Sequence, residues 1–476
     1  MHPHSGDGIP LLACVKISHM NRKSFLSRVF ASIALLAPFA LAITIIGPAQ
    51  QSAHAQPIRQ VVSDIDKRIE QHRKRDARLV FELPGGGQLP AGKQVQVELT
   101  RHAFQFGSML GGFNSGSQQE NETYRQRFLE AMNFATLIFI WEDYEKQPNQ
   151  TRLADKTAVA KWCRERGVAV KGHNLVWNLE PSWVKRLSPD AAEKQMWKRV
   201  VRESAAFRGL VDTWDVFNES TESMYHAKEK SATAQLHALK RLGIPQAVRK
   251  SFYLAKRANP DATLLINDYE TTEKYAKNIQ ACLDQGADID VIGIQSHMHQ
   301  GYWGAEKIWD VCNRFARFGK PIHFTELTVL SGRLMSKQDN DWSSRRSGWV
   351  STPQREKSQA DQVRETYRLL FSHPSVEAIT WWDLADRYAW MGAPGGLLRD
   401  DFSPKPAYYV VRDLVKKGWH TSLSQPTDAS GQLSMRGFYG GYAVKTELDG
   451  RIYRGRFSLR RDQPDLISVR LEAANR

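Results

Sequence analysis

Two glutamates lie at the ends of short segments that are rich in apolar and aromatic residues. Glu219 ends residues 213–219, and Glu326 is the last but one of residues 321–327. Either glutamate alone could make an ion pair or contact a helix N-terminus. Together they suit cleavage of a glycosidic bond, in which one carboxylic acid donates a proton and a second carboxylate attacks the sugar.

Polar residues end other segments of the same kind. His173 ends one of them, and Gln295 and His297 end another. Side chains two residues apart on a strand share a face, so Gln295 and His297 are predicted to point together. A histidine at a strand end is more often a packed, hydrogen-bonded residue than a ligand. Tryptophan packs well against the C–H face of a sugar, and three tryptophans end or follow these segments: Trp177, Trp382 and Trp390.

The elements that must position these residues alternate regularly between residues 103 and 418. The strand candidates are residues 104–110, 136–142, 169–177, 213–219, 263–268, 290–297, 321–327 and 376–383. The helix candidates are residues 154–166, 190–207, 244–258, 272–285, 305–318 and 358–371. This order predicts an α/β fold, a (β/α)8 TIM barrel with its active site at the C-terminal ends of the strands. A doubly wound open sheet is the alternative, but no Gly-rich nucleotide loop follows a strand candidate.

The chain divides into four parts on this interpretation. Residues 56–100 are a β-rich prologue in which 79–83, a Gly-Gly-Gly turn and 95–99 suggest a hairpin. Residues 101–419 form the catalytic barrel, and residues 420–476 form a small β-rich extension. The extension is expected to support the barrel, with carbohydrate binding as the alternative. A long loop at 331–355 carries Trp342 and Trp349, which could line an outer sugar site or pack the loop.

Residues 1–55 are predicted to be a signal peptide, with residues 1–19 as a possible start-site artefact. Three basic residues precede an apolar run at 30–46, and Ala53-His54-Ala55 is a cleavage site of the A-x-A type. The alternative is a membrane anchor, because the run approaches the lower length limit for a span. We expect a secreted or periplasmic protein that is cleaved near Ala55 and keeps no stable membrane span.

Composition and cysteine spacing restrict which binding partners, disulfides and metal sites the protein is expected to have. The net charge of +15 is spread along the chain without a basic stripe interleaved with aromatics, which disfavours nucleic-acid binding. Three cysteines remain after cleavage, and buried free thiols are expected rather than a disulfide framework: Cys163, Cys282 and Cys312. The spacing of the cysteines matches no metal site, so neither a cofactor nor a metal is predicted. A monomer is expected.

The motifs in order resemble the family 10 glycoside hydrolases, the endo-β-1,4-xylanases, along nearly the whole mature chain. The matching stretches are residues 101–108, Trp-Asp-Val-x-Asn-Glu at 214–219, Asn-Asp-Tyr at 267–269, Gln-Ser-His at 295–297, Thr-Glu-Leu at 325–327 and the Trp-x-x-x-Asp-x-Tyr-x-Trp pattern at 382–390. The resemblance implies a secreted, retaining hydrolase of a xylan-like polysaccharide, with Glu219 as acid/base and Glu326 as nucleophile. It also implies sugar contacts, or contacts with the nucleophile, by His173, Trp177, Asn218, Gln295, His297, Trp382, Trp390 and Trp141.

The chain departs from the family pattern at two places. Where the family has Glu-Asn-x-x-Lys-Trp on the second strand, residues 136–141 keep only Trp141. A site without those hydrogen-bonding groups loses much of its discrimination between sugars, unless Glu142, Asp143 or Glu145 replace them. The family's aspartate two residues after the nucleophile is Thr328 here, which changes the support of His297.

Three alternatives follow from these observations. The enzyme could cleave another β-linked glycan, or the barrel could be a catalytically weak carbohydrate-binding protein, which the losses on the second strand motivate. A metal-dependent barrel hydrolase is the third, prompted by His297-x-His299. A metal site on strand ends needs further ligands than this pair supplies.

Overall fold

The computed structural model describes residues 57–222, 233–339 and 341–474. The signal peptide and its cleavage site, predicted at 1–55, lie outside the described residues. In the part of the chain that is described, no helix is long and apolar enough to cross a membrane.

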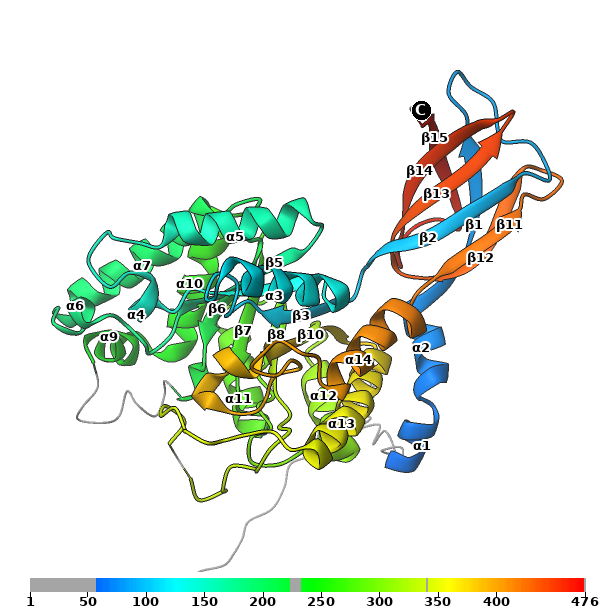
Figure 1. Ribbon diagram of the computed structural model, residues 1–476. Helices are drawn as coiled ribbons and strands as arrows, with labels where there is room; N and C mark the ends of the chain where they lie inside the picture. The colour runs from blue at the N-terminus through cyan, green and yellow to red at the C-terminus, as the bar shows by residue number, and fades with distance from the viewer. Residues whose placement is uncertain (1–56, 223–232, 340, 475–476) are drawn as a thin grey trace, which may run out of the picture. The chain divides into compact units, whose positions relative to one another are not determined.

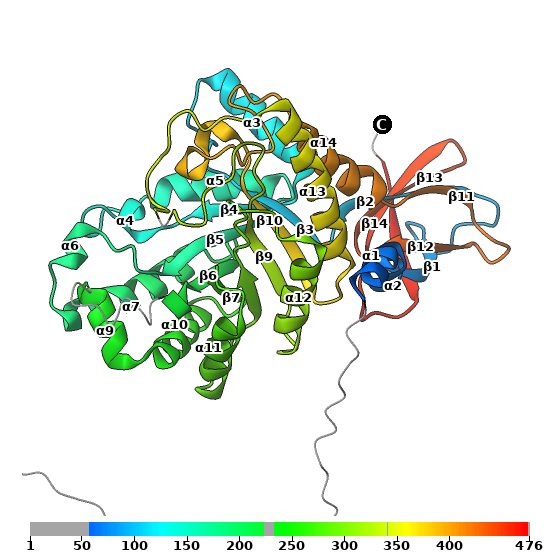
Figure 2. The ribbon, with the colours of Figure 1, turned by 90° about the horizontal axis from the view of Figure 1, so that it is seen from below.

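Eight parallel strands close into a barrel within the described residues, which confirms the predicted fold class. Figure 2 shows these strands at the centre with helices outside them. In chain order they are β3 (Gln105–Met109), β4 (Phe134–Ile138), β5 (Ala169–Val176), β6 (Thr213–Asn218), β7 (Thr263–Asp268), β8 (Val291–Ile294), β9 (Ile322–Leu327) and β10 (Val376–Asp383). Closure comes from the pairing of β10 with β3.

Helices follow the barrel strands as the periodicity predicts. They are α3 (Gln118–Ala131), α4 (Trp141–Tyr144), α5 (Leu153–Glu165), α6 (Ser182–Lys185), α7 (Pro189–Ala206), α9 (Ala234–Leu242), α10 (Ile244–Ala258), α11 (Glu273–Asp284), α12 (Gly304–Ala316), α13 (Pro353–Ser372) and α14 (Pro406–Asp413). Several begin at a side-chain cap, such as the capping box of Ser117 and Glu120 on α3. The sequence candidates correspond to α5, α7, α10, α11, α12 and α13, whereas α3, α4, α6, α9 and α14 were not among them.

Two glycines let large side chains lie close to the strands. A Cβ on Gly172 of β5 would lie 2.2 Å from the Trp214 ring, which is fully buried. A Cβ on Gly293 of β8 would lie 2.5 Å from Oδ1 of Asn267. Both contacts are too short for any other residue, so each glycine reserves space for a side chain of the neighbouring strand.

The β-rich parts at the two ends of the chain form one seven-stranded sheet in the order β11-β2-β13-β14-β15-β1-β12. Figure 1 shows the blue strands among the orange and red ones. The strands are β1 (Lys74–Glu82), β2 (Gln94–His102), β11 (Ser422–Pro426), β12 (Gln432–Phe438), β13 (Gly440–Leu448), β14 (Arg451–Leu459) and β15 (Leu466–Ala473).

The predicted prologue hairpin is wrong. Strand β1 pairs with β12 and β15, whereas β2 pairs with β11 and β13. Two helices, α1 (Ile58–Ser63) and α2 (Ile65–Arg73), also precede β1, so the prologue is not purely β. The sequence shows the alternation of each strand but not its partners, which come from the other end of the chain.

A buried arginine at the end of α2 joins this helix to the barrel. The Arg73 guanidinium donates to the carbonyl oxygens of Phe371, His373 and Val376 at 2.5 to 2.7 Å. These carbonyls lie at the end of α13 and the start of β10. Burial lowers the pKa of Arg73 to about 9, so the side chain stays charged at neutral pH.

The three described cysteines are free and buried, as the composition indicated. Burial raises the pKa of the Cys163 and Cys282 thiols to about 12. These thiols therefore belong to the core and are not reactive nucleophiles.

Candidate active site

The two predicted catalytic glutamates lie at the C-terminal ends of β6 and β9. Glu219 directly follows β6, and its N–H donates to the carbonyl oxygen of Asn267 at 2.7 Å. Its φ of 55° lies in the left-handed region, which non-glycine residues seldom adopt. Such backbone conformations are concentrated at functional sites. Glu326 lies inside β9, with 3% of its surface exposed.

The Glu219 carboxyl group accepts hydrogen bonds from two side chains, and its surroundings favour its protonated form. The Trp177 indole donates to Oε2 at 2.9 Å, and Nε2 of Gln295 donates to Oε1 at 3.0 Å. Burial raises the pKa of Glu219 well above its ordinary value, and a hydrogen bond with Glu222 and that residue's charge raise it further. A carboxyl group in this environment suits a general acid.

Glu326 has the opposite environment. Nδ2 of Asn267 donates to Oε1 at 2.8 Å, and the His297 ring approaches Oε2 at 3.1 Å. Burial alone would raise the pKa of Glu326, but His173, His297 and the Lys171 ammonium outweigh it and hold this pKa below its ordinary value. The surroundings therefore favour the ionised form of Glu326 and the protonated form of Glu219, the combination that a nucleophile and a general acid need.

A chain of amides connects the two carboxyl groups. Gln295 donates to Glu219 and, at 3.4 Å, to Oδ1 of Asn218. Asn267 donates to the same Oδ1 at 2.8 Å and also to Glu326. These bonds orient the Asn218 amide, and its buried Nδ2 has no partner among the described residues. This free donor suits a sugar hydroxyl, which is the role that the resemblance implies for Asn218.

Two histidines flank Glu326. Nδ1 of His173 lies 2.8 Å from Oδ2 of Asp215, which also accepts from the Lys171 ammonium at 2.7 Å. An ionised aspartate accepts only, so His173 carries its proton on Nδ1. On the other side, Nδ1 of His297 lies 3.3 Å from the Thr328 hydroxyl. The other ring nitrogen, Nε2, lies 3.1 Å from Oε2 of Glu326, so an Nε2–H bonds the carboxylate.

This cluster is better explained as a hydrogen-bond network than as a metal site. His173, Asp215 and Glu326 place one potential ligand atom each within 4.8 Å of one another. The Lys171 ammonium already neutralises Asp215, and a second cation beside it would be repelled. No cluster of three ligands within the described ranges contains both His297 and His299, so the metal-dependent alternative gains no support.

Residues 98–414 match the profile of Glycosyl hydrolase family 10. The chain belongs to this family. The Endo-1,4-beta-xylanase B of Thermotoga neapolitana is 27% identical over 295 residues, 58% of this chain and 78% of that protein. The Anti-sigma-I factor RsgI6 of Acetivibrio thermocellus is 24% identical over 401 residues, 82% of this chain and 47% of that protein. The chain thus spans about half the length of that relative, and 45% of the Endo-1,4-beta-xylanase/feruloyl esterase of Xylanibacter ruminicola.

Solved structures agree with the barrel. Xylanase 10B of Thermotoga petrophila RKU-1 in complex with xylobiose has a TM-score of 0.55 at 22% identity, covering 66% of this chain and 95% of that chain. A GH10 endoxylanase from a sugarcane soil metagenome has a TM-score of 0.57 at 21% identity, covering 66% of this chain and 97% of that chain. At these identities the likeness shows the fold.

Among the aromatic residues predicted from the family 10 resemblance, Trp382 and Trp390 lie beside the histidines that flank Glu326. The Trp382 ring centroid is 5.3 Å from that of His173 and 5.9 Å from that of His297. The half-buried Trp390 lies 4.8 Å from His297. The N–H of Trp390 donates to Asp383, whose pKa burial and the charges of Asp386 and Glu326 raise to about 8. Asp383 was not singled out from the sequence.

Trp141, which was also predicted to bind the sugar, contacts two buried charged residues. It is buried, its indole donates to Glu145 at 2.9 Å, and the Arg199 guanidinium lies 5.4 Å over its ring. Neither of these partners is one of the two glutamates. Its assignment to substrate binding therefore stays a prediction.

The family's missing polar groups on the second strand are not replaced by the carboxylates downstream. Glu145 is buried and bonded to both terminal nitrogens of Arg202, at 2.7 and 3.0 Å. Glu142 pairs with Lys185, and Asp143 with Lys146, at the surface. Thr136 lies buried on β4. This wall of the family 10 site is therefore less polar in this chain than the family pattern.

Glu222 was not predicted from the sequence. Asn267 was noted only as part of the Asn-Asp-Tyr motif at 267–269. Glu222 lies three residues after Glu219, a spacing that brings side chains together once a helix begins there. Asn267 links both glutamates from β7, which the alignment of strand ends on one barrel face could have indicated.

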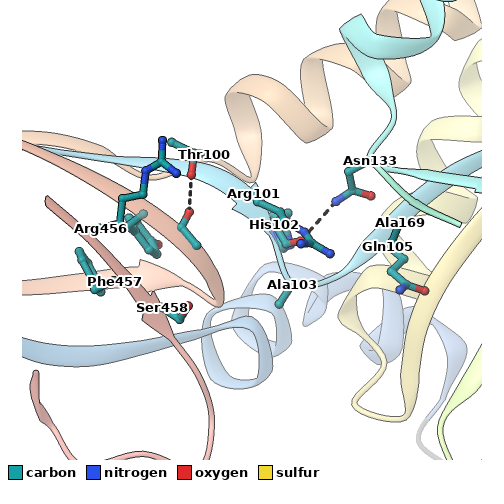
Figure 3. Close-up of a pocket in the computed structure, with 12 residues that line it drawn as sticks. Thr100, Arg101, His102, Ala103, Gln105, Asn133, Ala169, Arg456, Phe457 and Ser458 are labelled. Carbon is teal, nitrogen blue, oxygen red and sulfur yellow. Dashed lines mark hydrogen bonds between the residues drawn. The ribbon is translucent and has the colours of Figure 1, made fainter. Parts of the chain in front are cut away.

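A separate cavity of about 520 Å³ lies away from these residues (Figure 3). It is lined by Gln105 and Ala169, the first residues of β3 and β5, and by residues of β2, β13 and β14, including Arg101 and Arg456. The N-terminal strand ends mark the face opposite the catalytic one, where side chains usually serve stability.

Proposed function

We propose that this chain is a retaining glycoside hydrolase that cleaves β-1,4-xylan-like polysaccharide by double displacement. The observation that carries the proposal is the opposite tuning of two buried carboxyl groups on one face of the barrel. Glu219 has its pKa raised by burial and Glu222, and Glu326 has its pKa lowered by His173 and His297 against the effect of burial.

The mechanism follows from these states. Glu219 donates its proton to the leaving oxygen while the ionised Glu326 attacks the anomeric carbon and forms a glycosyl-enzyme. Glu219, now ionised, takes a proton from water, which releases the sugar with its configuration retained. Trp177 and Gln295 support the newly charged Glu219, and the free Nδ2 of Asn218 is placed for a hydroxyl of the bound sugar.

The substrate is proposed from the relatives. Several bear the printed name endo-1,4-beta-xylanase, and one neighbouring structure contains xylobiose. The chain's less polar second strand weakens the grip on a xylose unit on one side of the cleavage point. Another β-linked glycan is therefore the first alternative substrate.

A carbohydrate-binding protein with weak catalysis is the second candidate function. The same loss on β4 favours it, and one relative is named as an anti-sigma factor rather than as an enzyme. The complete set of catalytic contacts around Glu219 and Glu326 argues for turnover. We also propose export of the chain, on the strength of the A-x-A site at 53–55, and a monomeric state.

The test is a product assay on the mature chain, residues 56–476, with xylan, arabinoxylan, glucuronoxylan, mixed-linkage β-glucan and cellulose. Short xylo-oligosaccharides are expected from the xylans. Release of products from β-glucan alone would move the substrate to another glycan. Oligosaccharide binding by calorimetry without any product would favour the binding protein.

A further inference from the structure

The loop between β9 and α13, residues 328–339 and 341–352, holds the turn that carries Trp390. The Arg345 guanidinium donates to the carbonyl oxygens of Ala389 and Arg387 at 3.2 and 3.4 Å. The N–H of Arg346 donates to the carbonyl oxygen of Met391 at 2.8 Å. Residues 387–392, here called the Trp390 turn, are thus bonded to this β9–α13 loop at three carbonyls.

The Trp390 turn has a backbone that needs such support. Met391 has a φ of 60° and Gly392 a φ of 68°, so two consecutive residues occupy the left-handed region. This conformation is costly for methionine and persists only when the surrounding structure enforces it. A Cβ on Gly392 would lie 2.9 Å from the carbonyl oxygen of Arg346, which shows how closely the loop lies on the turn.

Trp342 of the loop contacts the Trp390 ring itself. The two indoles are stacked, with centroids 5.8 Å apart and planes 26° apart. Trp390 in turn lies 4.8 Å from His297, which bonds the nucleophile Glu326. A continuous series of contacts therefore runs from the loop to the Glu326 carboxylate, through Trp342, Trp390 and His297.

A small apolar cluster anchors the loop end of this series. Its members are Leu330, Met335, Trp349, Met391 and Ala393, with Trp342 and Trp390 against it. His299 lies among the rings, edge-on to Trp342 at 5.7 Å and to Trp390 at 5.4 Å. Both its nitrogens are buried without a partner among the described residues, so its ring acts by packing.

We propose that the β9–α13 loop fixes Trp390 against the sugar at the cleavage site, and that Trp342 is the positioning residue through which it does so. The inference rests on the proposed glycosidase function, since Trp390 is a sugar contact only if a glycan occupies the site. In this series of contacts Trp342 reaches Glu326 by way of Trp390, whose ring is the part that meets the sugar. The loop is therefore expected to act on substrate binding more than on the chemical step.

The test compares Trp342→Ala, Trp342→Phe and the control Trp309→Ala in the mature chain, with xylohexaose as substrate. Trp309 is a partly buried tryptophan on α12 that contacts His373 and Arg68. Trp342→Ala is expected to raise KM about three- to tenfold with kcat within about twofold. Trp342→Phe should restore most of the affinity, and Trp309→Ala should leave KM unchanged. A fall in kcat at constant KM would overturn the proposal.

Hydrogen exchange of the peptide containing residues 387–392 provides a readout that needs no activity. It is expected to become faster in Trp342→Ala but not in Trp309→Ala, and unchanged exchange would contradict the positioning role. If the parent chain does not cleave xylohexaose, the proposed function fails while the exchange result still decides the role of Trp342.

Discussion

At the scale of single residues, two glutamates of the same type acquire opposite states from their neighbours. Glu219 faces Glu222 and Asp268, whereas Glu326 faces His173 and His297. The sequence predicted both glutamates and most of their partners, because motifs place these residue types at strand ends. After burial, Glu222 is the largest cause of the raised pKa of Glu219, and Glu222 was not among the residues singled out from the sequence. Glu222 belongs to none of the motifs, so no motif placed it beside Glu219.

Replacing Glu222 by glutamine tests this tuning. Catalysis requires protonated Glu219 and ionised Glu326, so activity falls as pH rises through the pKa of Glu219 and as pH falls through that of Glu326. Glu222→Gln removes a charge that raises the pKa of Glu219, so the alkaline limb of the kcat/KM profile is expected at lower pH. The acid limb should not move. An alkaline limb that stays in place would show that Glu222 does not tune the acid.

At the scale of elements, long periodic segments were predicted well and irregular ones were not. Strands β7 and β10 and helix α10 have the predicted bounds. The second strand was placed at 136–142, yet β4 ends at Ile138 and α4 begins at Trp141. An apolar run continues across that boundary, so hydropathy alone could not show where the strand ends and the helix begins.

Gly172→Ala is predicted to destabilise β5 against β6. The added Cβ would meet the buried Trp214 ring at 2.2 Å, and overpacking of this kind costs about 1–3 kcal/mol. Gly441→Ala is the matched control, because a Cβ there would lie 3.8 Å from the Cβ of Arg101, an ordinary contact. Urea unfolding measures both. Equal free energies of unfolding for the two variants would mean that the ring can move aside.

Arg73→Met is predicted to loosen α2 from the barrel. Three carbonyl oxygens lose their charged donor, and hydrogen bonds of this class contribute about 1.5–3 kcal/mol each when buried partners are left unsatisfied. A loss of at least about 2 kcal/mol in the free energy of unfolding is expected by denaturant titration. Arg78→Met, at an exposed position of β1, serves as control. A loss no greater than the control's would refute the anchoring role.

At the scale of the whole described chain, strands from the two ends pair in one seven-stranded sheet, which is separate from the eight-stranded barrel. The sequence indicated β character at both ends, yet pairing between residues hundreds of positions apart leaves no local signal. The family profile, which matches residues 98–414, spans the barrel and leaves most of this sheet outside.

Removal of residues 420–476 is predicted to impair folding even though the barrel is kept intact. Strands β1 and β2 would lose β11 to β15, and their buried faces, which include Leu79, Phe81 and Val95, would be exposed. Exposed edges and apolar faces promote aggregation. Size-exclusion chromatography of residues 57–419 should show soluble aggregates. A monomer with the stability of the mature chain would contradict the shared sheet.

The central claim is that Glu326 attacks the sugar while Glu219 supplies the proton. The most direct measurement is trapping of the glycosyl-enzyme with a 2-deoxy-2-fluoro xylobioside that carries a good leaving group, followed by peptide mass spectrometry. The account predicts one added disaccharide mass per chain, on Glu326, and none in Glu326→Ala. A label on another residue, or steady turnover of the reagent by Glu326→Ala, would contradict it.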